Sequence, residues 1–288
     1  ETIYDKDDVT YPYSVANMLK KNGYRVASFH ANTKTFYNRG KFHKRLGYDM
    51  HYSAYDLQTS GLLDKNKNYF SDYNFISDDN LYDLMISDKP FFTFFTTYSG
   101  HLEYNTNNKV YKSIKKTLSK KKYGEEEYVY RTLVHDTDDA IKTLIEKLEK
   151  SKLLDKTVLV LVSDHYVYGY SDTDYVAMKK NKLNDRKELQ NTPFIIWSKD
   201  IEAKTIDTIL DTADILPTLL NMLDITYDPK NYLGDDVFST SHDDFVWFSD
   251  GTFIKSSDCD LSDESILTKV NYNINKNRDI LLTNYYGK

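Results

Sequence analysis

The chain has 288 residues, of which 40% are hydrophobic and 28% charged, and its formal net charge at pH 7 is −6. This length and apolar content exclude a disordered chain, and the negative charge excludes the basic footprint of a nucleic-acid-binding protein. The single cysteine, Cys259, excludes an internal disulfide, and no apolar run is long enough to cross a bilayer.

The N-terminal half predicts one helix and two strands. Residues 13–22 place apolar side chains on one helical face, and Gly23 follows where a helix end favours positive φ. Residues 24–29 then predict a strand. Residues 90–98 predict another, apolar on both faces as in a buried parallel sheet.

The C-terminal half continues the alternation of helices and strands. Residues 125–150 predict the longest helix, because apolar side chains recur along one stripe. Residues 157–162 predict the clearest central strand of the sheet, and residues 194–197 predict a further strand. Asp214 is expected to cap a helix that runs through Leu223.

This alternation predicts an α/β fold with a mainly parallel sheet flanked by helices. We expect a single domain over residues 1–288, with its main α/β part in residues 1–225. Residues 226–288 form the C-terminal portion, in which residues 245–254 predict a hairpin and residues 263–286 a closing helix.

Histidines follow three of the predicted strands. His30, His101 and the pair Asp164-His165 each come after a strand, whereas the other four histidines lie in expected loops or on a helix. Ligands of parallel α/β sheets bind beyond the carboxyl ends of the strands. These residues are therefore expected to converge at one edge of the sheet.

Two chemistries are suggested by these strand ends. Asp164 offers a hard oxygen and His165 a borderline nitrogen, which suits a metal ion; the pair alone fits a capping Asp beside a surface His better, but three histidines at three strand ends favour the metal. Arg39 follows His30 closely, and a guanidinium can bind phosphate through two parallel hydrogen bonds. The alternative for the Arg39 segment is an ordinary polar loop.

Six further patterns occur in order along the chain: FHAN at 29–32 with FYNR at 36–39 and LGYD at 46–49, TYSGH at 97–101, SDHY at 163–166, LQNTPFI at 189–195, DILPTLL at 214–220 and LGDDVF at 233–238. Together they resemble the lipoteichoic acid synthases. That family of phosphoglycerol transferases belongs to the sulfatase and alkaline phosphatase superfamily. The resemblance implies an alkaline-phosphatase-like fold.

The resemblance also implies an activity. Members of that family transfer glycerol phosphate from phosphatidylglycerol to a polyglycerolphosphate chain, using a threonine nucleophile and Mn²⁺ or another divalent cation such as Mg²⁺. By resemblance, Asp164 and His165 are metal ligands. We therefore expect an extracellular enzyme at the membrane of a Gram-positive-type bacterium.

The substrate-binding residues are implied in the same way. His30, Tyr37, Arg39 and His101 fall on family positions that hold the glycerol phosphate group, and His101 is the candidate acid for the diacylglycerol leaving oxygen. Tyr37 is a departure, because the family usually has Trp there. Gly100 is a second departure, since the family commonly has Asn before this histidine.

The resemblance places the nucleophilic threonine and another acidic metal ligand well upstream of the present segment. Thr2 and Thr10 are therefore poor candidates for the nucleophile. We expect this chain to lack the N-terminal strand, the nucleophile segment and the membrane anchor, and to be soluble and inactive alone.

Two alternative functions stay open. A sulfatase or phosphodiesterase of the same superfamily is the first, although a sulfatase needs a Cys or Ser converted to formylglycine and Cys259 lies far from the strand-end motifs. A non-catalytic module that binds teichoic acid is the second. The retained Asp164 and His165 argue against it, because a dead homologue has no need of metal ligands.

Overall fold

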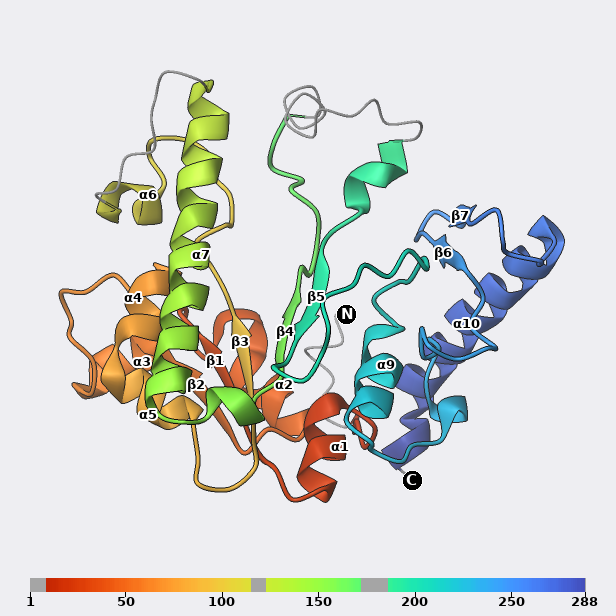
Figure 1. Cartoon of the computed structure of the whole chain (residues 1–288), viewed down its shortest axis with the longest axis horizontal. Helices are drawn as coiled ribbons and strands as arrows, with labels where there is room; N and C mark the ends of the chain where they lie inside the picture. Colours follow the sequence, from red (N-terminus) through yellow and green to blue (C-terminus); the bar gives the residue numbers. More distant parts are fainter. Residues whose placement is uncertain (1–8, 115–122, 172–185, 288) are drawn as a thin grey trace.

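The computed structural model describes residues 9–114, 123–171 and 186–287 (Figure 1). Strand β1 (Arg25–His30) lies between β2 (Met50–Ser53) and β3 (Phe91–Thr96), and all three run parallel. In this register His30 stands opposite Thr96 of β3. The expected parallel sheet and its first two predicted strands are confirmed.

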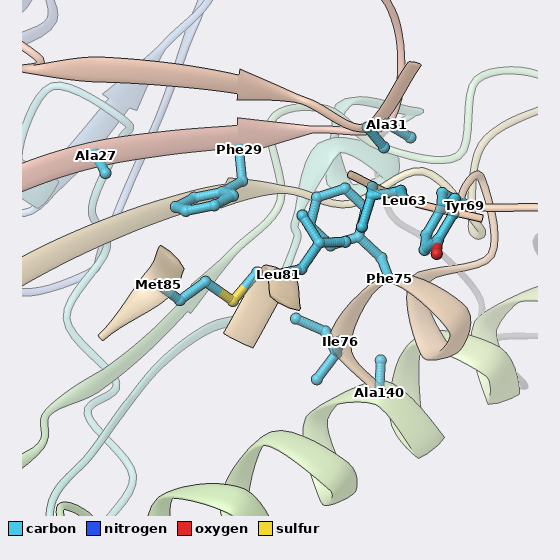
Figure 2. Packing of buried hydrophobic residues seen from close by; sticks show 11 residues of the cluster. Ala27, Phe29, Ala31, Leu63, Tyr69, Phe75, Ile76, Leu81, Met85 and Ala140 are labelled. Atoms are coloured by element: carbon cyan, nitrogen blue, oxygen red, sulfur yellow. The ribbon is translucent and has the colours of Figure 1, made fainter. Parts of the chain in front are cut away.

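One face of β1 supports the larger part of the core. Phe29 is fully buried on this face, where α3 (Ala54–Ser60), α4 (Asp72–Ser77), α5 (Asp79–Met85) and α7 (Glu125–Lys150) contribute apolar side chains (Figure 2). The cluster comprises Ala27, Phe29, Ala31, Ala54, Leu63, Tyr69, Phe75, Ile76, Leu81, Met85 and Ala140. Period-2 alternation along β1 selects which residues enter it.

The opposite face of β1 carries Val26, Ser28 and His30. Around Val26 pack residues of α1 (Val15–Lys21) and α9 (Ile215–Met222). Helix α1 begins where the Ser14 hydroxyl accepts from an amide of its first turn, and it ends before Gly23, whose φ is 84°. The sheet is therefore covered by helices on both faces, as the α/β pattern predicted.

Strands β4 (Leu159–Val162) and β5 (Phe194–Trp197) correct one expectation. In the part of the chain that the structure describes, they pair only with each other, antiparallel, so β4 is not a central strand of the parallel sheet. Val162 is 47% and Ile195 50% exposed. The apolar run itself was recognised correctly, but a run of that kind does not say which strands lie beside it.

The C-terminal portion carries the expected hairpin and helix. Strands β6 (Phe245–Trp247) and β7 (Phe253–Lys255) pair antiparallel, and Gly251 in their turn has a φ of 82°. Helix α10 (Asp263–Thr283) ends earlier than expected, at Asn284 with a φ of 47°. The single domain with a boundary near residue 225 stays a prediction.

The shorter elements between β1 and β3 were not predicted from the sequence. They include β2, α3, α4, α5 and α2 (Arg39–Arg45). The remaining short helices are α6 (Lys109–Ser113), η2 (Phe36–Asn38), η4 (Leu154–Lys156), η5 (Arg186–Gln190), η6 (Pro229–Asn231) and η7 (Tyr285–Gly287). None of the described helices has the length and apolar character required to cross a membrane.

Candidate functional site

Three histidines and Tyr98 form a chain of ring contacts. The centroids of His30 and Tyr98 lie 6.3 Å apart, and Tyr98 stacks on His101 at 5.7 Å with 13° between the ring planes. The His101 ring in turn meets His165 edge-on at 6.0 Å. The chain ends that follow β1, β3 and β4 therefore lie close together, but not at one edge of one sheet as predicted, because β4 belongs to a different sheet.

All three imidazoles contact a main-chain carbonyl oxygen through Nδ1. Each Nδ1 lies within hydrogen-bond distance of a carbonyl oxygen: His30 of Thr96 (3.1 Å), His101 of Leu102 (3.0 Å) and His165 of Tyr166 (2.8 Å). A carbonyl oxygen only accepts, so Nδ1 carries the hydrogen in each case. In the neutral ring, Nε2 then holds the lone pair for a ligand.

His30 is the most buried of the three, with 3% of its surface exposed. Burial, and to a smaller extent the positive charge of Arg39, lower its pKa to about 4. His30 is therefore neutral at pH 7. Its Nε2 can accept a hydrogen bond from a hydroxyl group but cannot supply a positive charge to a phosphate.

Arg39 follows an unusual turn. Tyr37 and Asn38 have φ values of 50° and 51°, which is a left-handed conformation that a tyrosine rarely adopts. Such strain costs about 1–3 kcal/mol and recurs at functional sites. The turn leaves Tyr37 62% exposed, and the Arg39 guanidinium lies 5.8 Å from the centre of the Phe36 ring.

Ser28, His43 and His51 form a polar cluster near Arg39. No role was predicted for these residues from the sequence. The hydroxyl of Ser28 contacts Nδ1 of His43 at 2.8 Å and Nδ1 of His51 at 2.9 Å. Burial is the main cause that lowers the pKa of His43 to about 3 and that of His51 to about 4, and the charge of Arg39 contributes to both values. The arginine is thus a cationic group beside neutral imidazoles, and the Asp56 carboxylate also acts on His51, in the opposite direction.

The predicted metal ligands lie at the outer end of the site. Asp164 Oδ1 and His165 Nε2 are 3.5 Å apart, and their side chains are 81% and 37% exposed. The His165 Nδ1 contact to a carbonyl is the arrangement that metal-binding histidines favour. Within the described ranges, however, no group of three or more His, Cys, Asp or Glu could hold an ion. The pair fits part of a metal site.

An open hollow of about 400 Å³ is lined by residues of the segment after His101, from Leu102 to Asn105, and by the first turn of α7. Its lining includes the carboxylates of Glu103, Glu125 and Glu126. Their negative charges disfavour a phosphate in this hollow.

The two threonines considered as nucleophiles give no support to that role. The Thr10 amide donates to Asn284 Oδ1 at 3.0 Å, beside the end of α10. Thr2 lies outside the described residues. The expectation that neither acts as the nucleophile stays a prediction.

Known proteins resemble the chain over most of its length. The family model described as Sulfatase matches residues 3–225. Lipoteichoic acid synthase 2 of Bacillus subtilis is 29% identical over 253 residues, which is 84% of this chain and 37% of that protein. Lipoteichoic acid synthase of Staphylococcus aureus strain USA300 is 29% identical over 259 residues, or 86% of this chain and 38% of its own length.

Two solved structures share the fold. The lipoteichoic acid synthase LtaP of Listeria monocytogenes superposes with a TM-score of 0.72 at 20% identity, covering 95% of this chain and 74% of the other. An alkaline phosphatase superfamily protein of Vibrio parahaemolyticus gives 0.68 at 19% identity, covering 100% and 73%. The expected alkaline-phosphatase-like fold is confirmed, while the chain spans under two-fifths of the curated relatives it matches.

Proposed function

This chain belongs to the sulfatase family, and on that premise we propose that it is the phosphoglycerol-transferring kind, which acts on the glycerol phosphate head group of phosphatidylglycerol. The similarity to two lipoteichoic acid synthases supports this choice over a sulfate ester hydrolase. The acceptor would be a polyglycerolphosphate chain. Its place of action would be the outer face of a Gram-positive-type cell membrane.

One observation carries the proposal: a cationic guanidinium stands among neutral imidazoles at the end of β1. Arg39 lowers the pKa values of His30, His43 and His51, so its charge lies near all three rings. A phosphate monoanion or diester suits the guanidinium fork. The glycerol hydroxyls suit neutral ring nitrogens, which can accept from them.

We assign the substrate contacts on this basis. Arg39 would bind the phosphate oxygens, and Nε2 of His30 would accept from a glycerol hydroxyl. The exposed ring of Tyr37 would cover the head group from outside. In its imidazolium form, His101 would give the proton on Nε2 to the leaving oxygen of diacylglycerol, while the hydrogen on Nδ1 stays bonded to the Leu102 carbonyl.

Asp164 and His165 would contribute to a site for Mn²⁺ or another divalent cation such as Mg²⁺. Bound there, the cation would stabilise negative charge on the phosphoryl oxygens. With two donors from the described residues, water would have to fill the remaining positions around the cation, so it would be held weakly. We therefore propose that the chain alone binds the head group without transferring it.

Manganese binding tests the metal assignment separately from turnover. We expect the chain to bind Mn²⁺ weakly. Binding is measured as the loss of the electron paramagnetic resonance signal of the free ion when Mn²⁺ is titrated into the protein. The double variant Asp164→Ala, His165→Ala should leave the signal of the free ion unchanged. Equal binding by both proteins would remove these residues from the metal site.

Turnover is tested with labelled phosphatidylglycerol in the presence of Mn²⁺. The proposal expects no diacylglycerol release by the purified chain. Release that disappears in Asp164→Ala would show that the chain is a complete catalyst. Hydrolysis of sulfate esters, lost in the same variant, would instead favour the hydrolase.

A further inference from the structure

Two buried carboxylates lie beneath the loop that follows β3. Asp72, in the first turn of α4, is 1% exposed, and Asp136, in the middle of α7, is 6% exposed. Neither has a role in the site assigned above. The loop that they contact contains Tyr98 and His101, two of the rings that join the strand ends.

Asp72 fixes the backbone of this loop. Its Oδ1 accepts from the Tyr98 amide at 2.8 Å, and its Oδ2 accepts from the Ser99 amide at 3.1 Å. The Thr137 hydroxyl donates to the same Oδ2 at 2.8 Å. One carboxylate therefore binds two successive amides of the loop and ties them to α7.

Asp136 completes the connection through the Ser99 side chain. The Ser99 hydroxyl donates to Asp136 Oδ2 at 2.6 Å and accepts from the Asp72 amide at 2.8 Å. Ser71 donates to both oxygens of Asp136, at 2.9 and 3.0 Å. Ser99 itself is fully buried. The loop, α4 and α7 thus meet at a single hydrogen-bonded group of side chains.

Two buried carboxylates close together do little to increase the stability of the fold. Burial raises the pKa of Asp72 to about 6, and the nearby negative charge of Asp136 acts in the same direction. Apolar residues of similar size would pack there without this penalty. Directed hydrogen bonds, by contrast, fix the position of the atoms that they join.

We propose that Asp72 and Asp136 are positioning residues, whose hydrogen bonds to loop 98–101 hold the imidazole of His101 in place at the candidate site. The inference rests on the proposed function, because it assigns His101 to the head group. Loss of the network would let Tyr98 and His101 separate from His30. Neither carboxylate touches the substrate.

The first test compares affinities for glycerol 3-phosphate, measured by calorimetry on the full chain. Asp136→Ala and Ser99→Ala are expected to weaken binding by about tenfold or more, since each removes a charge-assisted hydrogen bond that holds the loop. Asp136→Asn retains an oxygen that accepts from Ser99. It should recover affinity to within about threefold of the wild type.

The matched control is Tyr69→Phe, which removes a buried hydrogen bond of 2.6 Å to Asp78 from the same half of the molecule. It should lower the unfolding temperature but leave the affinity unchanged. The ring resonances of His101, assigned with His101→Gln, should move in Ser99→Ala and stay in place in Tyr69→Phe.

Opposite results separate the two proposals. If Asp136→Ala and Ser99→Ala lower the unfolding temperature while the affinity and the His101 resonances stay unchanged, the positioning role is overturned. If the wild type does not bind glycerol 3-phosphate, the proposed function fails, and the His101 resonances alone decide the positioning role. Should Asp136→Ala fail to fold, Ser99→Ala carries the test.

Discussion

At the residue scale, the candidate site depends on imidazoles whose tautomers are set by the main chain. His30, His101 and His165 each present Nε2 because a carbonyl oxygen occupies Nδ1. For His30, burial and the charge of Arg39 also prevent protonation at neutral pH. A neutral ring beside a fixed cation suits a ligand that combines hydroxyl groups with a phosphate.

This arrangement predicts that the His30 ring takes up a proton only at low pH. We expect its ring resonances to titrate with a midpoint near pH 4, well below an ordinary histidine, and its Nδ1 hydrogen to be observable at pH 7. Heteronuclear NMR of ¹⁵N-labelled protein measures both. A midpoint between pH 6 and 7 would mean that the ring is solvated and not held as described.

The sequence located the polar residues that directly follow the strands better than the residues between them. Asp164, His165 and His30 were found because each follows an apolar strand. Tyr98 was not singled out, although its ring links two of the histidines. Ser28 was missed as well, because a serine within an apolar strand carries no signal of the two histidines that it contacts.

At the element scale, sequence periodicity predicted the helices and strands that bury one clear face. Helix α7 has the bounds expected, residues 125–150, because its apolar stripe and the acidic first turn mark it clearly. Asp214 occupies the expected N-cap position of α9 but makes no capping bond there. Its oxygens accept instead from the amides of Asp211 and Asp235, contacts that sequence spacing does not reveal.

The sequence also could not predict which strands pair with β4. An apolar run predicts a strand buried on both faces, but its burial depends on neighbours from elsewhere in the chain. Leu161 is 37% and Val162 47% exposed, although both belong to that run. The sequence therefore predicted the strand itself but not its partner strand or the exposure of its side chains.

The exposure of β4 leads to a prediction for stability. Val162→Thr should lower the free energy of unfolding by less than about 0.5 kcal/mol, because a half-exposed methyl group contributes little. Phe29→Ala, at a fully buried position, should lower it by about 3–5 kcal/mol. Urea unfolding of both variants measures the difference. A large loss in Val162→Thr would show that β4 is covered in solution.

At the whole-molecule scale, buried titratable groups determine the response to acid. His30, His43 and His51 all have lowered pKa values, so the stability that they confer is complete above pH 6.5 and is lost as pH falls toward 4. Asp72 acts oppositely, because its raised pKa favours the folded state as pH falls below about 6. Three histidines outweigh one aspartate, so the protein should be acid-sensitive.

We therefore expect the free energy of unfolding to fall by roughly 4 kcal/mol between pH 7 and pH 5. Urea unfolding at several pH values measures this loss. His43→Phe should reduce the loss by nearly half, because one ring of three is removed while the opposing effect of Asp72 remains, and its neighbours, Tyr48 and Phe94, are aromatic. An equal loss in the variant would exclude His43 as a source of the acid response.

The central claim is that the end of β1 binds glycerol phosphate through Arg39. The most direct measurement is the affinity of the purified chain for glycerol 3-phosphate by calorimetry, beside Arg39→Ala and Arg39→Lys. We expect binding by the wild type, a loss of about 10- to 100-fold in Arg39→Ala, and a partial loss in Arg39→Lys, which keeps the charge without the fork. Equal affinity in all three proteins would contradict the claim.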